Sequence, residues 1–246
     1  MEHERYKDAL GSALARGGLR LVYQPVVCAK SESVYKYECL LRVYEEGVWV
    51  SAGSYIAERE KLGGLHEIDI FVLQQAAKVL TQRQDITLSV NVSNGSLSSE
   101  QWIEAVVLVA QDANVANRLI IEVTETGSLE DLNEIAKFVS VVQPYGFRVA
   151  IDDFGSGVFH PEKCSIDELA NMKVNIIKID GRYVCKMLAC EASARFINAI
   201  VQFAQKHSIK TVAEFVENKS VARALREIGV DYLQGHYFSS ALQAIP

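Results

Sequence analysis

The segment VAIDDFGSG, residues 149–157, places two carboxylates side by side where an apolar run ends. Asp152 and Asp153 are followed by a turn that contains Gly155 and Gly157. An isolated Asp-Asp pair at the end of a strand most often caps a turn or a helix. A second interpretation is cation binding, because adjacent carboxylates repel each other unless positive charge lies nearby.

Polar side chains recur in or near the ends of the other predicted strands, which favours the second interpretation. Seven successive strands supply Glu38, Asn91, Glu122, Asp152 with Asp153, Lys178, Glu214 with Glu217, and Gln234. One such residue is usually a cap or part of a solvated rim. A series over seven strands indicates a shared site, because strand ends converge on one face of a barrel.

The donor types of this series indicate hard divalent cations. Crowded carboxylates raise one another's pKa values unless cations neutralise them. Carboxylate and amide oxygens suit Mg²⁺ or Mn²⁺, whereas zinc prefers histidine and cysteine. The five histidines form no HxxxH pair and the five cysteines form no CxxC pair. We therefore interpret Asp152 and Asp153 as metal ligands, one of which bridges two cations.

Strand-like and helix-like segments alternate along the whole chain. Eight apolar runs have the length of strands, at residues 19–27, 35–43, 86–93, 119–125, 147–154, 175–180, 209–217 and 230–238. Helical spacing of apolar residues fills most gaps, notably 54–80, 129–142, 192–207 and 220–228. We predict a single α/β domain over residues 1–246, a TIM-like (β/α)8 barrel, with an open doubly wound sheet as the competing architecture.

The first connection departs from the regular barrel pattern. The first two predicted strands are separated by the seven residues CAKSESV, 28–34. A parallel crossover needs about a dozen residues or more. We therefore predict that the first strand is antiparallel to the second and that the barrel is modified at its start.

Composition excludes several classes of function. The chain has 246 residues and a net charge of −6 with acids and bases mixed, so it lacks the basic footprint of a protein that binds nucleic-acid polymers. No apolar run is long enough to span a membrane, and the polar start MEHERYKDAL does not resemble a signal peptide. We expect a cytoplasmic protein with reduced cysteines, controlled by a partner, by oligomerisation or by further domains of a longer chain.

Short motifs carry a family resemblance. They are YQP (23–25), ECLLR (38–42), NVS (91–93), EVTE (122–125), DDFGSG (152–157), KID (178–180), VAEFVE (212–217) and QGH (234–236). In this order they resemble the EAL-domain phosphodiesterases, which hydrolyse the bacterial second messenger cyclic di-GMP to linear pGpG. The family fold is also a modified (β/α)8 barrel with an antiparallel first strand.

The resemblance implies a role for each residue of the series. Glu38, Asn91, Glu122 and Asp152 would hold one divalent cation, Mg²⁺ or Mn²⁺, and Asp152 with Asp153 would hold a second. Glu214 would lie beside the second cation or act as general base, and both roles stay open. Lys178 would orient the attacking water with help from Gln234, and Glu217 is grouped with the catalytic residues. Gln24, Leu40, Arg42 and Gln234 would bind cyclic di-GMP, and Glu125 would anchor the loop after DDFGSG.

Two departures from the family pattern and three alternative functions bear on this prediction. Phe215 replaces the usual glycine beside Glu214, where its ring could crowd the site or pack as core. The segment after DDFGSG is longer than usual, which affects the homodimer that the resemblance implies through residues 159–172 or the helix after Lys178.

A non-catalytic cyclic di-GMP receptor and an unrelated metal-dependent barrel hydrolase remain alternatives. A kinase is rejected, because the DFG at 153–155 has no Gly-rich loop or HRD segment with it.

Overall fold

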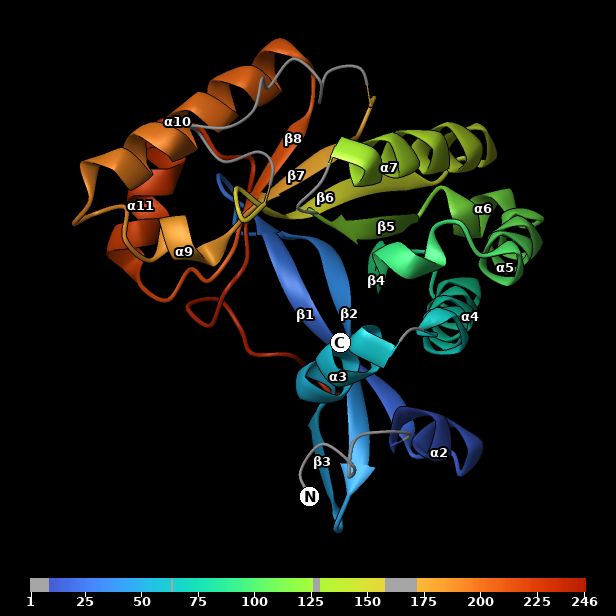
Figure 1. Cartoon of the computed structure of the whole chain (residues 1–246). Helices are drawn as coiled ribbons and strands as arrows, with labels where there is room; N and C mark the ends of the chain where they lie inside the picture. Colours follow the sequence, from blue (N-terminus) through green and yellow to red (C-terminus); the bar gives the residue numbers. More distant parts are fainter. Residues whose placement is uncertain (1–8, 63, 126–128, 158–171) are drawn as a thin grey trace.

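The computed structural model describes residues 9–62, 64–125, 129–157 and 172–246. Within this part of the chain, eight strands close into a barrel in the order β1-β9-β8-β7-β6-β5-β4-β2, and β2 pairs with β1 (Figure 1). The bounds are β1 Leu19–Cys28, β2 Val34–Glu45, β4 Leu88–Val92, β5 Leu119–Thr124, β6 Arg148–Phe154, β7 Ile176–Ile179, β8 Lys210–Ala213 and β9 Tyr232–Leu233. The predicted barrel is confirmed, and the open sheet is excluded.

The first strand runs against its neighbours, as the short connection predicts. β1 pairs antiparallel with both β2 and β9, whereas the pairs from β2–β4 through β8–β9 are parallel. The β1–β2 register sets Gln24 opposite Glu38 and Val26 opposite Lys36. Beyond the barrel, β2 continues into a hairpin with β3 (Val48–Ser51), which projects away from the body of the molecule and which the sequence analysis did not predict (Figure 1).

Helices cover the outside of the barrel (Figure 1). The described helices are α2 Ala9–Ala15, α3 Gly53–Leu62, α4 His66–Gln82, α5 Glu100–Ala110, α6 Ala113–Ala116, α7 Leu129–Val142, α9 Gly181–Val184, α10 Glu191–Lys206 and α11 Lys219–Ile228, with short 3-10 turns at Asn94–Ser96 and Gln143–Tyr145. Local sequence explains where α11 begins and ends. The side chain of Asn218 accepts a hydrogen bond from the Val221 amide and caps α11, and Gly229 ends this helix at a φ of +96°.

The core has two parts because the strands are covered on both faces. The larger part lies between the strands and the helices, where α10 buries Phe196, Ile197 and Ile200. The smaller part fills the inside of the barrel with Val26, Ile120, Ala150, Ile176 and Val212. Near-continuous apolar strands such as Leu119–Thr124 are typical of this arrangement.

Several predicted boundaries were wrong. The helical region predicted over residues 54–80 divides into α3 and α4, and Gly64 between them has a φ of +89°, which favours glycine. The strands predicted over 209–217 and 230–238 are shorter, because β8 ends at Ala213 and β9 at Leu233. The two segments stay hydrogen-bonded beyond these strand ends, since the Val216 amide donates to the Gln234 carbonyl at 3.0 Å. No helix in the described residues has the length and apolar character needed to cross a membrane.

Candidate active site

Strand alternation places the predicted site residues in one layer inside the barrel. Side chains two residues apart on a strand point to the same face. On β5 to β9, each apolar residue of the inner core is therefore followed two positions later by a polar one: Ile120 by Glu122, Ala150 by Asp152, Ile176 by Lys178, Val212 by Glu214, and Tyr232 by Gln234. β1 runs in the opposite direction, so Gln24 precedes Val26. The polar layer lies at the C-terminal ends of the parallel strands, the face where barrel enzymes build their sites.

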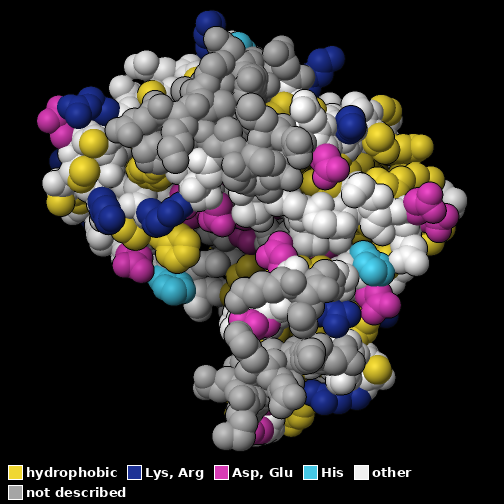
Figure 2. Space-filling model, in the orientation of Figure 1, with side chains coloured by type: hydrophobic (Ala, Val, Ile, Leu, Met, Phe, Trp, Pro, Cys, Tyr) yellow, Lys and Arg dark blue, Asp and Glu magenta, His cyan; other side chains and the backbone are white. Residues whose placement is uncertain are grey.

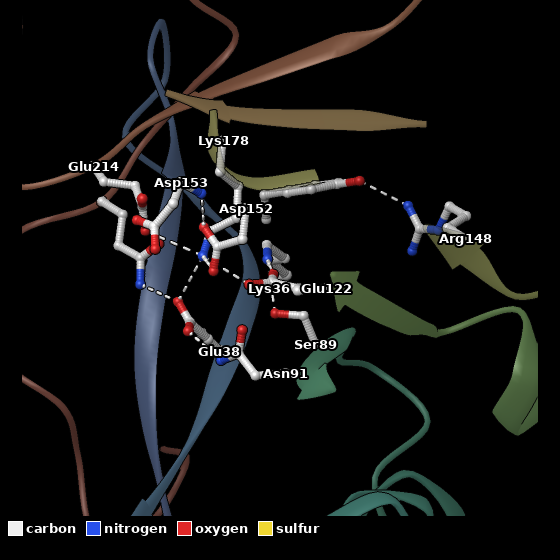
Figure 3. A network of polar contacts seen from close by, with 12 residues as sticks. Lys36, Glu38, Ser89, Asn91, Glu122, Arg148, Asp152, Asp153, Lys178 and Glu214 are labelled. Atoms are coloured by element: carbon white, nitrogen blue, oxygen red, sulfur yellow. Dashed lines mark hydrogen bonds and ion pairs between the residues drawn. The ribbon is translucent and has the colours of Figure 1, made fainter. Parts of the chain in front are cut away.

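Lys178 lies at the centre of this layer (Figure 3). Its Nζ contacts Oε2 of Glu122 at 2.7 Å and Oδ2 of Asp152 at 2.9 Å. It also contacts Oε1 of Glu214 at 3.1 Å and Oε2 of Glu38 at 3.3 Å. A fully buried ammonium thus joins carboxylates from four different strands or strand ends.

Glu38 receives two further hydrogen bonds from neighbouring strands. Nδ2 of Asn91 donates to Oε1 of Glu38 at 2.8 Å, and Nε2 of Gln234 donates to Oε2 at 2.7 Å. Both amides thus hold the carboxylate of Glu38 in one orientation. The structure brings Glu38, Asn91, Lys178 and Gln234 together as the sequence predicted, although their chemical roles stay predictions.

Asp152 and Asp153 diverge from one another even though they are adjacent. Asp153 has a φ of +51°, a left-handed conformation that costs free energy for a residue other than glycine, and its amide donates to Oδ1 of Asp152 at 2.8 Å. This turn lets both side chains reach one site instead of opposite faces of a strand. Oxygens of Glu38, Glu122 and Asp152 lie within 4.8 Å of one another, and so do oxygens of Asp152, Asp153 and Glu214.

The pKa values divide the carboxylates into two kinds. Burial would raise the pKa of Glu122, but Lys178 and Lys36 outweigh it and hold this pKa at about 2. Burial raises the pKa of Asp152 to about 6, since Lys178 only partly opposes burial and the charges of Glu122 and Glu38 add to it. Burial and the charge of Asp152 also raise the pKa of Glu214 well above its ordinary value. Burial therefore disfavours the ionised forms of Asp152 and Glu214, whereas the two lysines favour the ionised form of Glu122.

The donor set fits divalent cations. Among the described residues of this cluster, five carboxylates (Glu38, Glu122, Asp152, Asp153 and Glu214) face two ammonium groups (Lys36 and Lys178), which leaves a charge of −3 when all are ionised. The buried Oε1 of Gln234 accepts no hydrogen bond from the described part of the chain. Hard oxygen donors with excess negative charge suit Mg²⁺ or Mn²⁺, and Asp152 belongs to both carboxylate groups.

Two clefts flank the polar layer, and they contain the predicted substrate residues. One cleft contains the predicted residues Gln24, Glu217 and Gln234, and Glu214 and Phe215 also line it. Leu40 and Arg42 line the other, which reaches Asn91. The space-filling view shows Asp and Glu side chains around a hollow on this face (Figure 2). Glu217 is exposed and does not join the carboxylate groups around Lys178 that the described residues form.

Glu125 and Phe215 shape the surroundings of the site. The carboxylate of Glu125 accepts hydrogen bonds from the amides of Gly155, Ser156 and Gly157, which follow the Asp-Asp pair. Phe215 has a φ of +52° and is 60% exposed beside Glu214, so the second of its two possible placements, packing as ordinary core, is excluded. A Cβ atom at Gly181 would lie 2.2 Å from Cδ2 of Phe215, which shows how closely the ring packs on that backbone.

The sequence analysis missed a second buried lysine. Nζ of Lys36 forms an ion pair with Glu122 and donates to Oγ of Ser89 at 2.7 Å. Both Lys36 and Ser89 are fully buried. Strand periodicity could have found Lys36, because it precedes Glu38 by two residues and therefore faces the same interior.

The family of the chain follows from comparison with known proteins. The profile of the EAL domain matches residues 7–241. A cyclic di-GMP phosphodiesterase, PdeB of Shewanella oneidensis, is 30% identical over 234 residues, which is 92% of this chain and 27% of that protein. The chain therefore belongs to the EAL domain family, and it spans about a quarter of the length of that relative.

Solved structures of EAL domains share the fold closely. The PaMucR phosphodiesterase in complex with c-di-GMP aligns with a TM-score of 0.86 and 25% identity, over 97% of both chains. The EAL domain of FimX from Xanthomonas citri, also in complex with c-diGMP, aligns with a TM-score of 0.85 and 26% identity over 100% of this chain and 97% of that one. Both structures are described as complexes with c-di-GMP, and the first is also named a phosphodiesterase.

Proposed function

We propose that this chain hydrolyses cyclic di-GMP to linear pGpG in a reaction that depends on two divalent cations. The observation that carries the proposal is the shared position of Asp152. It belongs to two groups of carboxylates, one with Glu38 and Glu122 and one with Asp153 and Glu214, and each group is compact enough to surround one ion. Membership of the EAL domain family and relatives named cyclic di-GMP phosphodiesterases support the substrate.

Side chains from different strands would hold the cations. Glu38, Asn91, Glu122 and Asp152 are assigned to one ion, and Asp152 with Asp153 to the other. The preset orientation of Glu38 by Asn91 and Gln234 supports the first assignment. When bound, a pair of divalent cations lowers the pKa of a water molecule and polarises phosphate oxygens.

Lys178 and Glu214 would then orient the water and accept its proton. The water oxygen would form a bond to phosphorus as the bond from phosphorus to the 3′ oxygen breaks. The departing 3′ oxygen would take up a proton from solvent and become a hydroxyl, which leaves a 5′ phosphate on a linear dinucleotide. Lys178 orients the water. Glu214 accepts its proton in this proposal, which is supported by its raised pKa and its contact with Lys178 at 3.1 Å.

The two clefts would hold the dinucleotide on either side of the cation centre. Arg42 would bind a phosphate oxygen, because a guanidinium matches that geometry, and Leu40 beside it would contact the ligand. Gln24 and Gln234 would bind from the other cleft through amide groups that can both donate and accept hydrogen bonds. Glu217 lines this cleft and would act there through the substrate and not through the metal.

The experiment that tests the proposal is incubation of the purified protein with cyclic di-GMP and Mn²⁺, with products separated by anion-exchange chromatography. We expect pGpG to accumulate with the wild-type protein and not with Glu38→Gln. A protein that binds cyclic di-GMP in equilibrium dialysis and leaves it intact over hours would be a receptor, which is the alternative function of this fold. A protein that neither binds nor cleaves the dinucleotide would contradict both functions.

A further inference from the structure

Lys36 occupies a position in the barrel interior where most other strands carry an apolar side chain. The layer below the carboxylates consists of Val26, Ile120, Ala150, Ile176 and Val212, packed with Tyr232. β2 and β4 interrupt this layer, since Lys36 lies two residues before Glu38 and Ser89 two residues before Asn91. Lys36 is opposite Val26 in the β1–β2 register, so an ammonium group replaces hydrocarbon next to the apolar inner core.

The ammonium of Lys36 contacts the carboxylate of Glu122 in the proposed metal centre (Figure 3). It pairs with Oε1 of Glu122, while Nζ of Lys178 lies 2.7 Å from Oε2 of the same carboxylate. Glu122 is thus held between two ammonium groups, and all three side chains are almost fully inaccessible to solvent. Oγ of Ser89 accepts from Lys36 at 2.7 Å and fixes the lysine from the other side.

Packing alone does not explain a lysine at this position. A buried ammonium loses its hydration, and an apolar side chain of similar volume fills such a space without that loss. The strands β1 and β5 to β8 show that hydrocarbon is compatible with this layer. The contact that distinguishes Lys36 from its apolar neighbours is its ion pair with Glu122.

We propose that Lys36 is a positioning residue for the divalent-metal centre, a fixed internal cation that orients Glu122 and lowers the affinity of the carboxylate cluster for divalent ions. The proposal rests on the proposed function only in that the cluster binds metal. With Lys36 the fully ionised cluster has the charge of −3 given above, and without it the charge is −4. Because Coulomb attraction grows with this charge in a poorly hydrated interior, removal of Lys36 should tighten metal binding by about tenfold or more.

The test is a titration of metal-stripped protein with Mn²⁺, followed by the electron paramagnetic resonance signal of the free ion. We expect Lys36→Met to bind Mn²⁺ about tenfold or more tightly than wild type, with a larger Mn²⁺-induced rise in melting temperature. Lys36→Gln, which keeps a polar contact for Ser89, should show the same direction if Lys36→Met does not fold. The matched control is Lys210→Met, because Lys210 is exposed at the start of β8 and pairs with Asp231, away from the carboxylate cluster.

Each outcome decides the proposal. Tighter Mn²⁺ binding in the Lys36 variants with an unchanged Lys210 variant supports it. Equal or weaker Mn²⁺ binding in the Lys36 variants, with wild type binding the ion normally, overturns this inference and leaves the proposed function intact. A wild-type protein that binds no Mn²⁺ at millimolar concentration overturns the inference and the metal-dependent function together.

Discussion

At the scale of single residues, the site brings together acids with opposed pKa shifts. Glu122 is kept ionised by two lysines, whereas burial raises the pKa of both Asp152 and Glu214. Divalent cations compete with the protons on such acids, because a metal binds the ionised form. The raised pKa values of Asp152 and Glu214 should therefore make metal binding sensitive to pH.

The stabilisation of the protein by Mn²⁺ is predicted to grow as the pH rises. The folded pKa of Asp152 is about 6 against an ordinary 3.8, so between these values the folded state holds a proton that the unfolded chain has released. This group therefore lowers the metal-free stability as the pH rises through that window, and Mn²⁺ opposes the loss. The measurement is the Mn²⁺-induced change in melting temperature from about pH 5 to about pH 7. A change that does not depend on pH, and that Asp152→Asn leaves unaltered, would contradict the assignment.

Substitution of a proposed metal ligand should chiefly lower kcat, whereas substitution of a proposed substrate ligand should chiefly raise KM. Glu38→Ala is predicted to lower kcat by about a hundredfold or more, since it removes a carboxylate from the centre. Arg42→Ala is predicted to raise KM about tenfold to a hundredfold with a smaller effect on kcat, because a charged hydrogen bond to phosphate is lost. Steady-state kinetics with cyclic di-GMP measure both values. An unchanged KM with a collapsed kcat in Arg42→Ala would show that our role for this residue is wrong.

At the scale of elements, the period of two along strands made most of the site predictable. Five site residues lie on strands whose apolar runs were recognisable, so the convergence of their side chains followed from the barrel. They are Glu38, Asn91, Glu122, Asp152 and Lys178. Residues beyond the strand ends were less predictable. Glu217 was included in a strand that ends at Ala213, and the sequence contains no local signal for where pairing stops.

The elements that sequence reasoning missed have weak local patterns. The helix α5 (EQWIEAVVLVA) is apolar on several sides, which obscures the helical period, although Ser99 accepts from the Trp102 amide as a cap. The hairpin strand β3 has four residues. Lys36 was overlooked because a lone lysine in a strand usually points to solvent, and its burial depends on partners from β4 and β5.

The turn after β6 offers a prediction at this scale. Glu125→Ala removes the acceptor for the amides of Gly155, Ser156 and Gly157, and about 1–3 kcal/mol of unfolding free energy should be lost. Because Asp152 and Asp153 lead into this turn, Mn²⁺ affinity should fall as well. Urea unfolding and Mn²⁺ titration measure the two effects. Glu134→Ala on the exposed face of α7 is the matched control, and equal behaviour of the two variants would contradict the anchoring role.

At the scale of the whole molecule, the barrel was predictable because element order and one short connection restrict the topology strongly. The antiparallel first strand followed from a loop too short for a crossover, and the structure confirms it. The quaternary structure could not be predicted from the sequence in the same way. Residues 159–171 of the expected dimer surface lie outside the described residues, and Met172 at its edge is buried within the chain.

A homodimer remains a prediction of the family resemblance. The predicted surface includes residues 159–172 or α9, and a symmetric pair should bury on the order of 1,000 Å² or more in total. Light scattering at micromolar concentration is expected to give twice the chain mass of 27.3 kDa. A monomeric mass together with full phosphodiesterase activity would show that catalysis does not need this dimer.

The central claim is that Asp152 is shared by two cations that together drive hydrolysis of cyclic di-GMP. The most direct measurement is the rate of pGpG formation by metal-stripped protein as Mn²⁺ is added in known ratio to the chain. We predict negligible cleavage without metal, a rate that rises to a plateau only as a second equivalent binds, and loss of this second binding event in Asp152→Asn. Full cleavage by the metal-stripped protein in excess chelator, or a plateau at one equivalent, would contradict the account.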